Sequence, residues 1–596
     1  MHESLVKPNR PLFTDLAGLA AMVSDGDVFG VGGHHFARLP IALLRAIVER
    51  GVAGLRYVSW AGGLPLEMLL EANAVASIDI CFSSLDIFGL PPRFRAAAES
   101  EAIPVRDWTA LAMIQALRAA EANLPSLPFQ LPAGSEMMKH IPGARTVIDP
   151  LAEEPVGAIS PLRLDTVVLQ APRADALGNV EIYGARALDW PMVGAARKVL
   201  VTVEEIVAAG TLQRDGRNAV LTRNRISAIA AVPGSAWPTS CLPYYVTDYA
   251  ALKHVVSGGG TLNDALRLPT TGVPSIVCDA ARIGAARLAG AAPSVHRRDA
   301  PEASVDERMA IRIAAELDGS CFASAGAVSP LANVAYRLAK ATHAPDMIIA
   351  TMSCGHLDIA ASPMVLSLLE SVDAETAVAH AGGDDTYSTY YQAGAVTHEI
   401  IAAAQVDLHG RVNNIRLRRK DGGFVRLPGQ GGMADVANMH RDSVLYVTRQ
   451  SPLTLVPKVE MASSARFYVG DHERRARGYR PGTVRLITDL CVFALDPESQ
   501  RLVVIETFAG VTRARIVEAT GFSVTFAANC IELPAPDCEL LRILRERIDP
   551  FGLRRLEFVG ARERGSLLDE IISQDRSFVA ALVEPGESIG QGGRDR

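Results

Sequence analysis

Apolar and polar positions follow two different periods near the start of the chain. A short apolar run at Asp27–Val31 leads into a glycine turn, and LRYVSW at 55–60 has the unbroken apolar character of a buried strand. Between them, Pro40–Arg50 carries apolar residues at helical spacing. Its proline suits a first helical turn, and Gly51 suits the position after the last. Strand, helix and strand in this order form a βαβ unit, which predicts a parallel sheet.

The same order returns in the second half of the chain. We expect a helix over Val305–Glu316, a strand at Cys321–Ala325, a helix around Pro330–Ala341 and a strand at Met347–Met352. Both halves of the chain are therefore expected to be α/β.

A repeated turn motif relates the two halves. Residues 169–184 (LQAPRADALGNVEIYG) and 402–417 (AAAQVDLHGRVNNIRL) each place an apolar strand before an Asp, with a Gly three positions later. The aspartates are Asp175 and Asp407. This offset favours a tight turn, because Asp can bond the backbone and Gly accepts a positive φ.

A second pair of segments supports the repeat. SDGDVFGVGG at 24–33 is similar to LDGSCFASAG at 317–326, since Asp-Gly leads a short apolar strand into a glycine in both. Two related halves in one chain indicate a pseudo-dimer with a site at the seam. The predicted fold class is α/β, with two related open α/β domains that form this pseudo-dimer.

The repeat also sets the expected domain boundaries. Residues 91–150 are rich in Pro and Ala and fall within the longer spacing of the first half, so we interpret them as an inserted helical excursion. The other divisions are a first α/β domain at 11–255, a Gly-, Ala- and Pro-rich connector at 256–304, a second α/β domain at 305–575 and a frayed polar tail at 584–596.

Composition narrows the classes of function. The 596 residues are 49% hydrophobic and 21% charged, as in globular proteins, and the net charge of −7 gives nucleic-acid binding no electrostatic support. No apolar run reaches about 18 residues, so we expect no membrane span, and the N-terminal segment lacks the hydrophobic core of a signal peptide. Eight cysteines without a CxxC pair favour a cytoplasmic protein, and no metal site is expected.

The Gly-rich segment LPGQGGMADVAN at 427–438 is the strongest local signal for chemistry. Gly429, Gln430, Gly431 and Gly432 lie beside a predicted helix start. Glycines let backbone N–H groups approach an anionic oxygen with no Cβ in the way, so such a loop can form an oxyanion hole. The alternative is a simple turn.

The segment TMSCGHLD at 351–358 ends a predicted parallel strand, where ligand groups gather. A catalytic interpretation makes Ser353 or Cys354 the nucleophile and His356 its base. The alternative is a packed structural cysteine, because a lone Cys before Gly is more often buried than reactive.

Two further acidic segments receive a structural interpretation. Glu204 and Glu205 follow an apolar strand and are expected to form a solvated strand end. THEI at 397–400 is not a zinc-protease motif, because no second His follows at the required offset.

The motifs in their order resemble the family I CoA-transferases, with subunits A and B fused, and the branch they resemble best is the two-subunit glutaconate CoA-transferase type. The A-like segments are GVGG at 30–33, RLDTVVLQAPRADALGNVEIYG at 163–184, ARKVLVTVEEIV at 196–207 and PGSAWPTSCLPYYVTD at 233–248. The B-like segments are HAPDMIIATMSCG at 343–355, AQVDLHGRVNN at 404–414, PGQGGMADVAN at 428–438, TDLCVF at 488–493, GVTRARIVEATGF at 510–522 and ELPAPD at 532–537. The resemblance covers most of residues 15–260 and 305–555.

The resemblance implies an enzyme that transfers CoA between an acyl-CoA thioester and a carboxylate. In that family a B-half glutamate attacks the thioester in a ping-pong reaction, and glycine N–H groups stabilise the oxyanion. The implied oxyanion donors here are Gly431 and Gly432. The usual glutamate is absent from this chain, which has Ser353 at the nucleophile position and no Glu or Asp between Asp346 and Asp358.

The remaining site residues and partners are also implied by the resemblance. Substrate contacts are expected from Gly32, Gly33, Gly429, Gln430, Cys354 and His356. Coenzyme A is a co-substrate, and no other cofactor is expected. A homodimer of fused chains is expected, with acyl-CoA and a carboxylate acceptor as the small-molecule partners.

Two alternatives remain open. Related members of the superfamily lack the glutamate and hydrolyse a carbon–carbon bond in a cyclic diketone acyl-CoA, with a base from an A-half glutamate. The comparable stretch at 105–117 offers Asp107, and a hydrolase of this kind could also use Asp358 or Glu205 as its carboxylate. The other alternative is a CoA-ester-binding protein without transferase activity.

Overall fold

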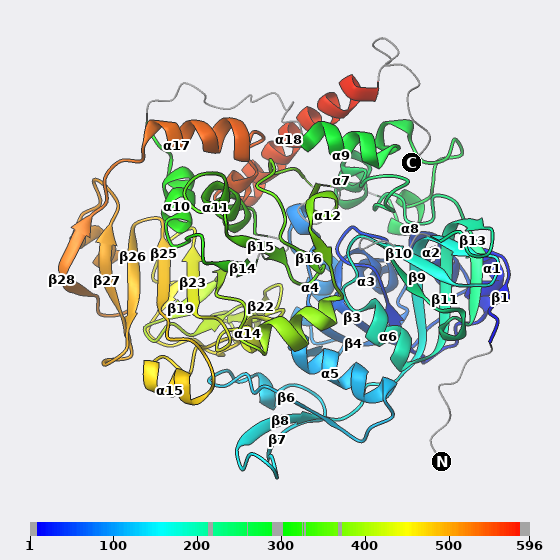
Figure 1. Ribbon diagram of the computed structural model, residues 1–596, viewed down its shortest axis with the longest axis horizontal. Helices are drawn as coiled ribbons and strands as arrows, with labels where there is room; N and C mark the ends of the chain where they lie inside the picture. The colour runs from blue at the N-terminus through cyan, green and yellow to red at the C-terminus, as the bar shows by residue number, and fades with distance from the viewer. Residues whose placement is uncertain are drawn as a thin grey trace.

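Two open α/β halves lie side by side in the computed structural model (Figure 1). The structure describes residues 9–212, 218–258, 260–288, 302–324, 326, 329–366 and 372–583. Each half is built on a ten-stranded sheet. The predicted tail at 584–596 lies outside the described residues, and the domain boundaries stay predictions.

The sheet of the first half is parallel along its main path. Its strands lie in the order β1 (Leu12–Phe13), β13 (Ala228–Ala231), β11 (Ala196–Val207), β9 (Leu164–Asp175), β2 (Val28–Val31), β3 (Leu55–Ala61), β4 (Val75–Phe82) and β5 (Val105–Asp107). A hairpin strand, β10 (Val180–Tyr183), pairs antiparallel with β9 and with β12 (Asn218–Leu221).

The sheet of the second half has a parallel centre with antiparallel pairs on both sides of it, and its last strand pairs parallel with its neighbour. Its strands lie in the order β17 (Ala379–His380), β16 (His356–Leu357), β15 (Ile348–Thr351), β14 (Phe322–Ser324), β18 (His398–Ala402), β23 (Asp442–Val447), β25 (Val484–Thr488), β26 (Cys491–Asp496), β27 (Arg501–Thr507) and β28 (Thr525–Glu532).

The two sheets share one topology at their centres. The parallel order β3-β2-β9-β11-β13 in the first half is the order β15-β14-β18-β23-β25 in the second. The repeated turns also correspond, because Gly178 and Gly410 have φ of +94° and +70° and each donates its N–H to the carbonyl of the preceding Asp at 2.8 Å. The predicted pair of related α/β domains is confirmed.

The helices between the strands begin and end close to their predicted limits. The first crossover helix is α2 (Ile41–Glu49), directly after Pro40, and Gly51 follows it with a φ of +72°. In the second half α10 (Val305–Ala314) precedes β14, and α11 (Pro330–Ala341) connects β14 to β15. A capping box in which Ser304 and Glu307 bond each other's backbone N–H groups explains where α10 begins.

The interpretation of residues 91–150 as a helical excursion is wrong in part. The segment does contain α4 (Pro92–Glu99) and α5 (Ala110–Glu121), but β5 between them extends the main sheet. It then forms β6 (Leu127–Phe129) and β7 (Ala144–Ile148), which pair with β8 (Pro155–Ile159) in a small antiparallel sheet that projects at the bottom of Figure 1. Composition did not predict these strands, because each is short and the Pro and Ala residues around them dominate the segment.

The last described helix, α18 (Ala561–Val583), ties the halves together. Its Arg564 donates to the Ile87 carbonyl of the first half at 2.8 Å, and its Asp575 pairs with Arg287 at 2.6 Å. Arg287 lies in α9 (Ala280–Leu288), a helix within the predicted connector. No helix of the part of the chain that the structure describes is long and apolar enough to cross a membrane.

Candidate active site

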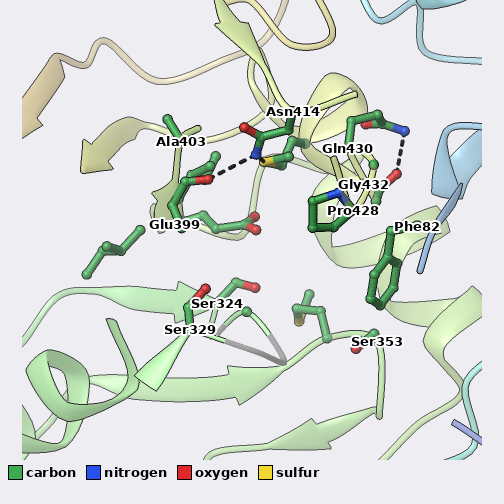
Figure 2. Close-up of a pocket in the computed structure, with 18 of the residues that line it drawn as sticks. Phe82, Ser324, Ser329, Ser353, Glu399, Ala403, Asn414, Pro428, Gln430 and Gly432 are labelled. Atoms are coloured by element: carbon green, nitrogen blue, oxygen red, sulfur yellow. Dashed lines mark hydrogen bonds between the residues drawn. The ribbon is translucent and has the colours of Figure 1, made fainter. Parts of the chain in front are cut away.

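A cavity of about 400 Å³ lies at the seam between the halves. The ends of β14 and β15 supply Ser324 and Ser353 to its wall, and β18 supplies Glu399 (Figure 2). The loop at 428–433 covers the opposite side, and the first half contributes Trp60 and Phe82. The cavity therefore needs both halves of the chain, as the repeat predicts.

Backbone pairing between the halves positions the Gly-rich loop. Gly429 forms a β-bridge with Phe82 at the end of β4, and the Gly431 N–H donates to the Cys81 carbonyl at 3.0 Å. Ser83 in turn donates its N–H to the Pro428 carbonyl at 2.7 Å. Gly429 has a φ of +115°, and a Cβ there would lie 2.8 Å from the Cys81 oxygen, so only glycine allows this approach.

Gln430 and Gly432 have different positions in the loop. Gln430 is buried, donates from Nε2 to the Trp108 carbonyl at 2.7 Å and accepts from the Ala434 N–H at 2.9 Å, so its side chain is committed to the protein. The N–H of Gly432 has no protein acceptor among the described residues. Gly432 lies at the start of α14 (Met433–Val436), against the ring of Tyr387.

Glu399 is the one carboxylate among the described residues that line the cavity. Its side chain is 12% exposed, and its Oε2 accepts from the Tyr391 hydroxyl at 2.8 Å and lies 3.0 Å from His440 Nε2. Burial, and then the charge of Glu399, raise the pKa of Tyr391 well above its usual value, so the hydroxyl keeps its proton and donates it to Glu399. One oxygen of Glu399 is thus held by Tyr391, and in Figure 2 the carboxylate faces the cavity.

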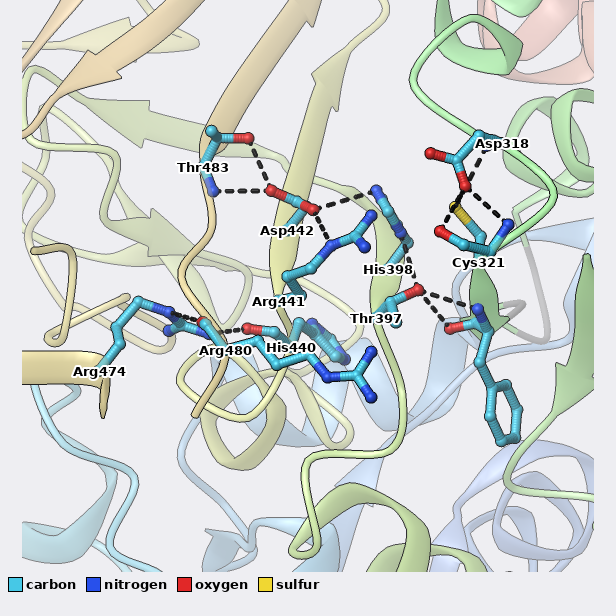
Figure 3. A network of polar contacts seen from close by, with 12 residues as sticks. Asp318, Cys321, Thr397, His398, His440, Arg441, Asp442, Arg474, Arg480 and Thr483 are labelled. Atoms are coloured by element: carbon cyan, nitrogen blue, oxygen red, sulfur yellow. Dashed lines mark hydrogen bonds and ion pairs between the residues drawn. The ribbon is translucent and has the colours of Figure 1, made fainter. Parts of the chain in front are cut away.

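Two arginines fix the backbone of His440, the residue whose imidazole lies beside Glu399. Figure 3 shows Arg474 at the His440 carbonyl. The His440 carbonyl accepts from Arg474 Nη2 and, at 3.4 Å, from Arg466 Nη1. Burial lowers the pKa of Arg474 to about 10 and that of Arg466 to about 9. Both guanidinium groups therefore remain charged at neutral pH and hold the backbone of His440, whose Nε2 lies 3.0 Å from the Glu399 carboxylate.

The sequence motifs at 351–358 lie only partly in the cavity. Ser353 lines it, and the one polar contact of its hydroxyl among the described residues is the Cys354 sulfur at 3.9 Å. Cys354 and His356 are buried and lie outside the cavity lining. Burial, and then the charges of His380 and Arg186, lower the pKa of His356 well below its usual value, so its ring stays neutral. Neither ring nitrogen of His356 has a hydrogen-bond partner among the described residues, so the predicted contact between Ser353 and His356 is not formed.

Gly32 and Gly33, which we expected to contact substrate, also lie outside the cavity. Their N–H groups donate to the Val168 carbonyl and to Asp189 Oδ1, each at 3.0 Å. Asp189 pairs with the buried Arg38 at 2.7 Å, and Arg38 donates to the Gln170 carbonyl. The loop after β2 is thus filled by its own side chains, whereas Gly326 and Ser329, the described residues that follow β14, line the cavity.

The carboxylates proposed for a hydrolase are all engaged elsewhere. Asp107 forms a two-pronged pair with Arg426, with one oxygen–nitrogen distance of 2.8 Å. Asp358 pairs with Lys340 at 2.6 Å, and Glu205 accepts from the Tyr244 hydroxyl at 2.7 Å; none of the three lines the cavity. Glu399 is not among the residues that the sequence predicts for the site, although one signal is present: an acidic residue lies in the apolar segment that forms β18.

The comparisons with known proteins agree with this arrangement. The family model described as Coenzyme A transferase matches residues 13–217 and 307–519. The chain belongs to the coenzyme A transferase family. The match to both halves confirms the predicted fusion of two subunit-like units.

Three relatives describe the extent of the similarity. The B and A subunits of 3-oxoadipate CoA-transferase from Pseudomonas knackmussii are 31% and 27% identical over 41% and 40% of this chain, and over 94% and 84% of their own length. The IpdA subunit of a cholesterol ring-cleaving hydrolase from Mycobacterium tuberculosis is 30% identical over 42% of this chain and 88% of its own. A solved acyl-CoA transferase from Escherichia coli O157:H7, YdiF, in thioester complex with CoA, covers 90% of this chain and 98% of its own with a TM-score of 0.63. At 15% identity, that likeness concerns the fold.

Proposed function

We propose that this member of the family transfers CoA between an acyl-CoA thioester and a carboxylate, and that Glu399 carries the covalent step. The observation that carries the proposal is the Glu399 carboxylate, held by Tyr391 in the cavity between the halves, opposite the Gly-rich loop. The names of the 3-oxoadipate CoA-transferase subunits support the same reaction class.

The steps follow from carboxylate chemistry. A Glu399 oxygen attacks the thioester carbonyl, the carbon–sulfur bond breaks, and a mixed anhydride and the CoA thiolate result. The thiolate then attacks the Glu399 carbonyl, which releases the first carboxylate and leaves a glutamyl-CoA thioester. A second carboxylate repeats these steps in reverse, so the energy of the thioester is kept on the enzyme.

Gly432 is the oxyanion donor in this proposal. Each tetrahedral intermediate places negative charge on a former carbonyl oxygen, which a nearby N–H stabilises. The Gly431 N–H is bonded to Cys81, whereas the Gly432 N–H has no acceptor among the described residues. The role that the resemblance implies for both glycines therefore rests on Gly432 in the conformation described.

Ser353 is a wall residue in this proposal and not the nucleophile. A serine ester formed from an acyl-CoA would release the CoA thiolate and could not regenerate a thioester with a second carboxylate. Serine also needs a base to accept its proton, and no described base contacts its hydroxyl.

Hydride trapping tests the assignment. After incubation with an acyl-CoA, sodium borohydride should reduce the glutamyl-CoA thioester to an alcohol, which peptide mass spectrometry should locate at Glu399. Glu399→Gln should abolish both the trap and transfer, while the matched control Ser353→Ala should keep them. A trap that persists in Glu399→Gln, or disappears only in Ser353→Ala, would refute the role of Glu399.

A gain-of-function variant adds a second test. Ser353→Glu in the Glu399→Gln background places a carboxylate at the position where the family carries its glutamate. Because both residues line one cavity, we expect partial return of transfer and of the hydride trap, now at residue 353.

Hydrolysis is the second candidate, favoured by the similarity to the IpdA subunit. Loss of acyl-CoA without any carboxylate acceptor, and without a hydride trap, would favour it over transfer. The transfer proposal needs no cofactor besides CoA as co-substrate. A homodimer and a cytoplasmic location stay predictions; the mass in solution tests the first, and the eight free thiols agree with the second.

A further inference from the structure

Most side chains that wall the seam cavity are apolar, and they come from both halves. Trp60 and Phe82 belong to the first half, and Met352, Ile401 and Met433 belong to the second. The ring of Tyr387 packs edge-on against Trp60 with centroids 5.2 Å apart, which closes one side. Such walls favour an apolar group over a hydrated one.

The charge of the described cavity lining has one sign only. Among the described residues that line the cavity, Glu399 is the one charged group, and none is Lys, Arg or His. Two arginines that contact segments next to the lining are paired: Arg118 contacts Asp384 at 2.9 Å, and Arg426 contacts Asp107. A second anion that entered the cavity would therefore meet no free cation of the lining.

We infer that the acyl group of the substrate is compact and uncharged, aliphatic or aromatic, and that the cavity discriminates against acyl groups with a second carboxylate. This inference rests on the proposed function, since it takes the acyl end of a CoA thioester to be the occupant of the cavity. The surroundings of Tyr387 also disfavour a further negative charge. Burial, and then the negative charges of Glu399 and Asp435, raise the pKa of the Tyr387 hydroxyl.

The size of the effect follows from Coulomb's law. Two like charges about 6 Å apart in a protein site of intermediate polarity repel enough to weaken binding by roughly a hundredfold. The volume of about 400 Å³ is near the lower end for small-molecule sites, and it must also admit the thiol end of CoA, which leaves room for a short chain or a single ring.

Thioether analogues of CoA test the inference without turnover. S-pentyl-CoA and S-(4-carboxybutyl)-CoA have similar length and differ in a terminal methyl or carboxylate, and neither can acylate the enzyme. We expect calorimetry on the full chain to show at least tenfold tighter binding of the pentyl analogue. The methyl ester of the carboxybutyl analogue should recover most of the difference, because it removes the charge and adds only one methyl group to the length.

Two variants locate the source of the discrimination. Glu399→Gln removes the one charge of the described lining, so the dissociation constants of the pentyl and carboxybutyl analogues should become more similar. Met433→Lys places a cation in the half-buried wall and should bring the two dissociation constants still closer together. The neutral control Met433→Leu should leave their ratio unchanged.

Equal or tighter binding of the carboxybutyl analogue to the wild-type chain would overturn the inference, whatever happens to turnover. A wrong acyl class must be distinguished from a wrong proposed function. Turnover of valeryl-CoA and glutaryl-CoA, with acetate as acceptor, makes this distinction. Absence of any CoA transfer and of any hydride trap counts against the function, whereas efficient transfer from glutaryl-CoA counts against the acyl class alone.

Discussion

Replacement of Gly432 by Ala is expected to damage the site far more than the same replacement at its neighbour Gly431. A Cβ on Gly432 would lie 2.2 Å from the Tyr387 hydroxyl oxygen and 2.5 Å from its ring, although its φ of −100° suits any residue. A Cβ on Gly431 meets nothing closer than Phe82 Cδ1 at 3.9 Å, but its φ is +58°. The two glycines are thus required for different reasons, one for space and one for backbone conformation.

The packing around Tyr387 sets the magnitude at Gly432. Its ring lies 5.2 Å from Trp60 and 4.8 Å from Tyr391, so it has little room to move. Restoring an ordinary contact of 3.4 Å requires the ring or the loop to shift by about 1 Å. Overpacking of this kind costs about 1–3 kcal/mol of stability, and a displacement of about 1 Å near reacting groups typically costs about a hundredfold in rate. At Gly431 the left-handed conformation alone costs about 1–2 kcal/mol.

Steady-state transfer rates and thermal unfolding of the two variants provide the assay. We expect Gly432→Ala to lose about a hundredfold in kcat and Gly431→Ala less than about tenfold. Tyr387→Leu makes room beside the loop, so Gly432→Ala should cost less in that background than alone. The reasoning fails if Gly432→Ala is as active as the wild-type chain, or if the Tyr387→Leu background leaves its cost unchanged.

Three further predictions concern the seam, the pH dependence of stability and the nucleophile. Arg426→Leu leaves Asp107, whose side chain is 11% exposed, without its partner and should cost about 3 kcal/mol of stability, whereas the double variant with Asp107→Leu should recover most of it, as denaturant unfolding can measure. Burial raises the pKa of Glu557 from 4.5 to about 7, so the folded chain binds this proton more tightly than the unfolded chain. The stability that this bound proton contributes is fully present below about pH 4.5 and is lost as the pH rises through about 7. Glu557→Gln should therefore remove up to about 3 kcal/mol of the pH dependence of the free energy of unfolding, which thermal unfolding curves can measure. Tyr391→Phe removes the hydroxyl that holds Glu399 and should lower kcat about tenfold with little change in KM, whereas an unchanged kcat would argue against this positioning role.

The fold could be predicted because its signals are local and repeated. The Asp-Gly turns at Asp175 and Asp407 depend on contacts within four residues, and both formed as the spacing indicates. The helix Pro330–Ala341 has the predicted limits, because its first-turn proline and its apolar stripe indicate the same range. The strands β6 and β7 were missed, because each is short and pairs with a partner that composition alone does not reveal.

The site was harder to predict, since its contacts join distant segments. The Gly-rich loop was identified, but its pairing with Cys81 and Phe82 in the other half cannot be inferred from local sequence. Gly32 and Gly33 repeat the pattern of the second half, yet Arg38 fills their loop. A repeated motif therefore predicts a repeated backbone. The surrounding side chains decide whether the loop in the first half or the one in the second half borders a cavity.

In the proposed function, the catalytic carboxylate Glu399 lies on a different strand from the family's glutamate position and lines the same cavity. Its strand β18 and the strand β15 that ends before Ser353 both pair with β14, so they are two positions apart in the same parallel sheet. In the register of the sheet Glu399 lies opposite Ser324, the last residue of β14, and both line the cavity that the Gly-rich loop closes. The reaction requires a carboxylate opposite an N–H donor, and it does not require that carboxylate to come from one strand. An absent residue at the family's usual position is therefore weak grounds for excluding the family's chemistry when another strand faces the same loop.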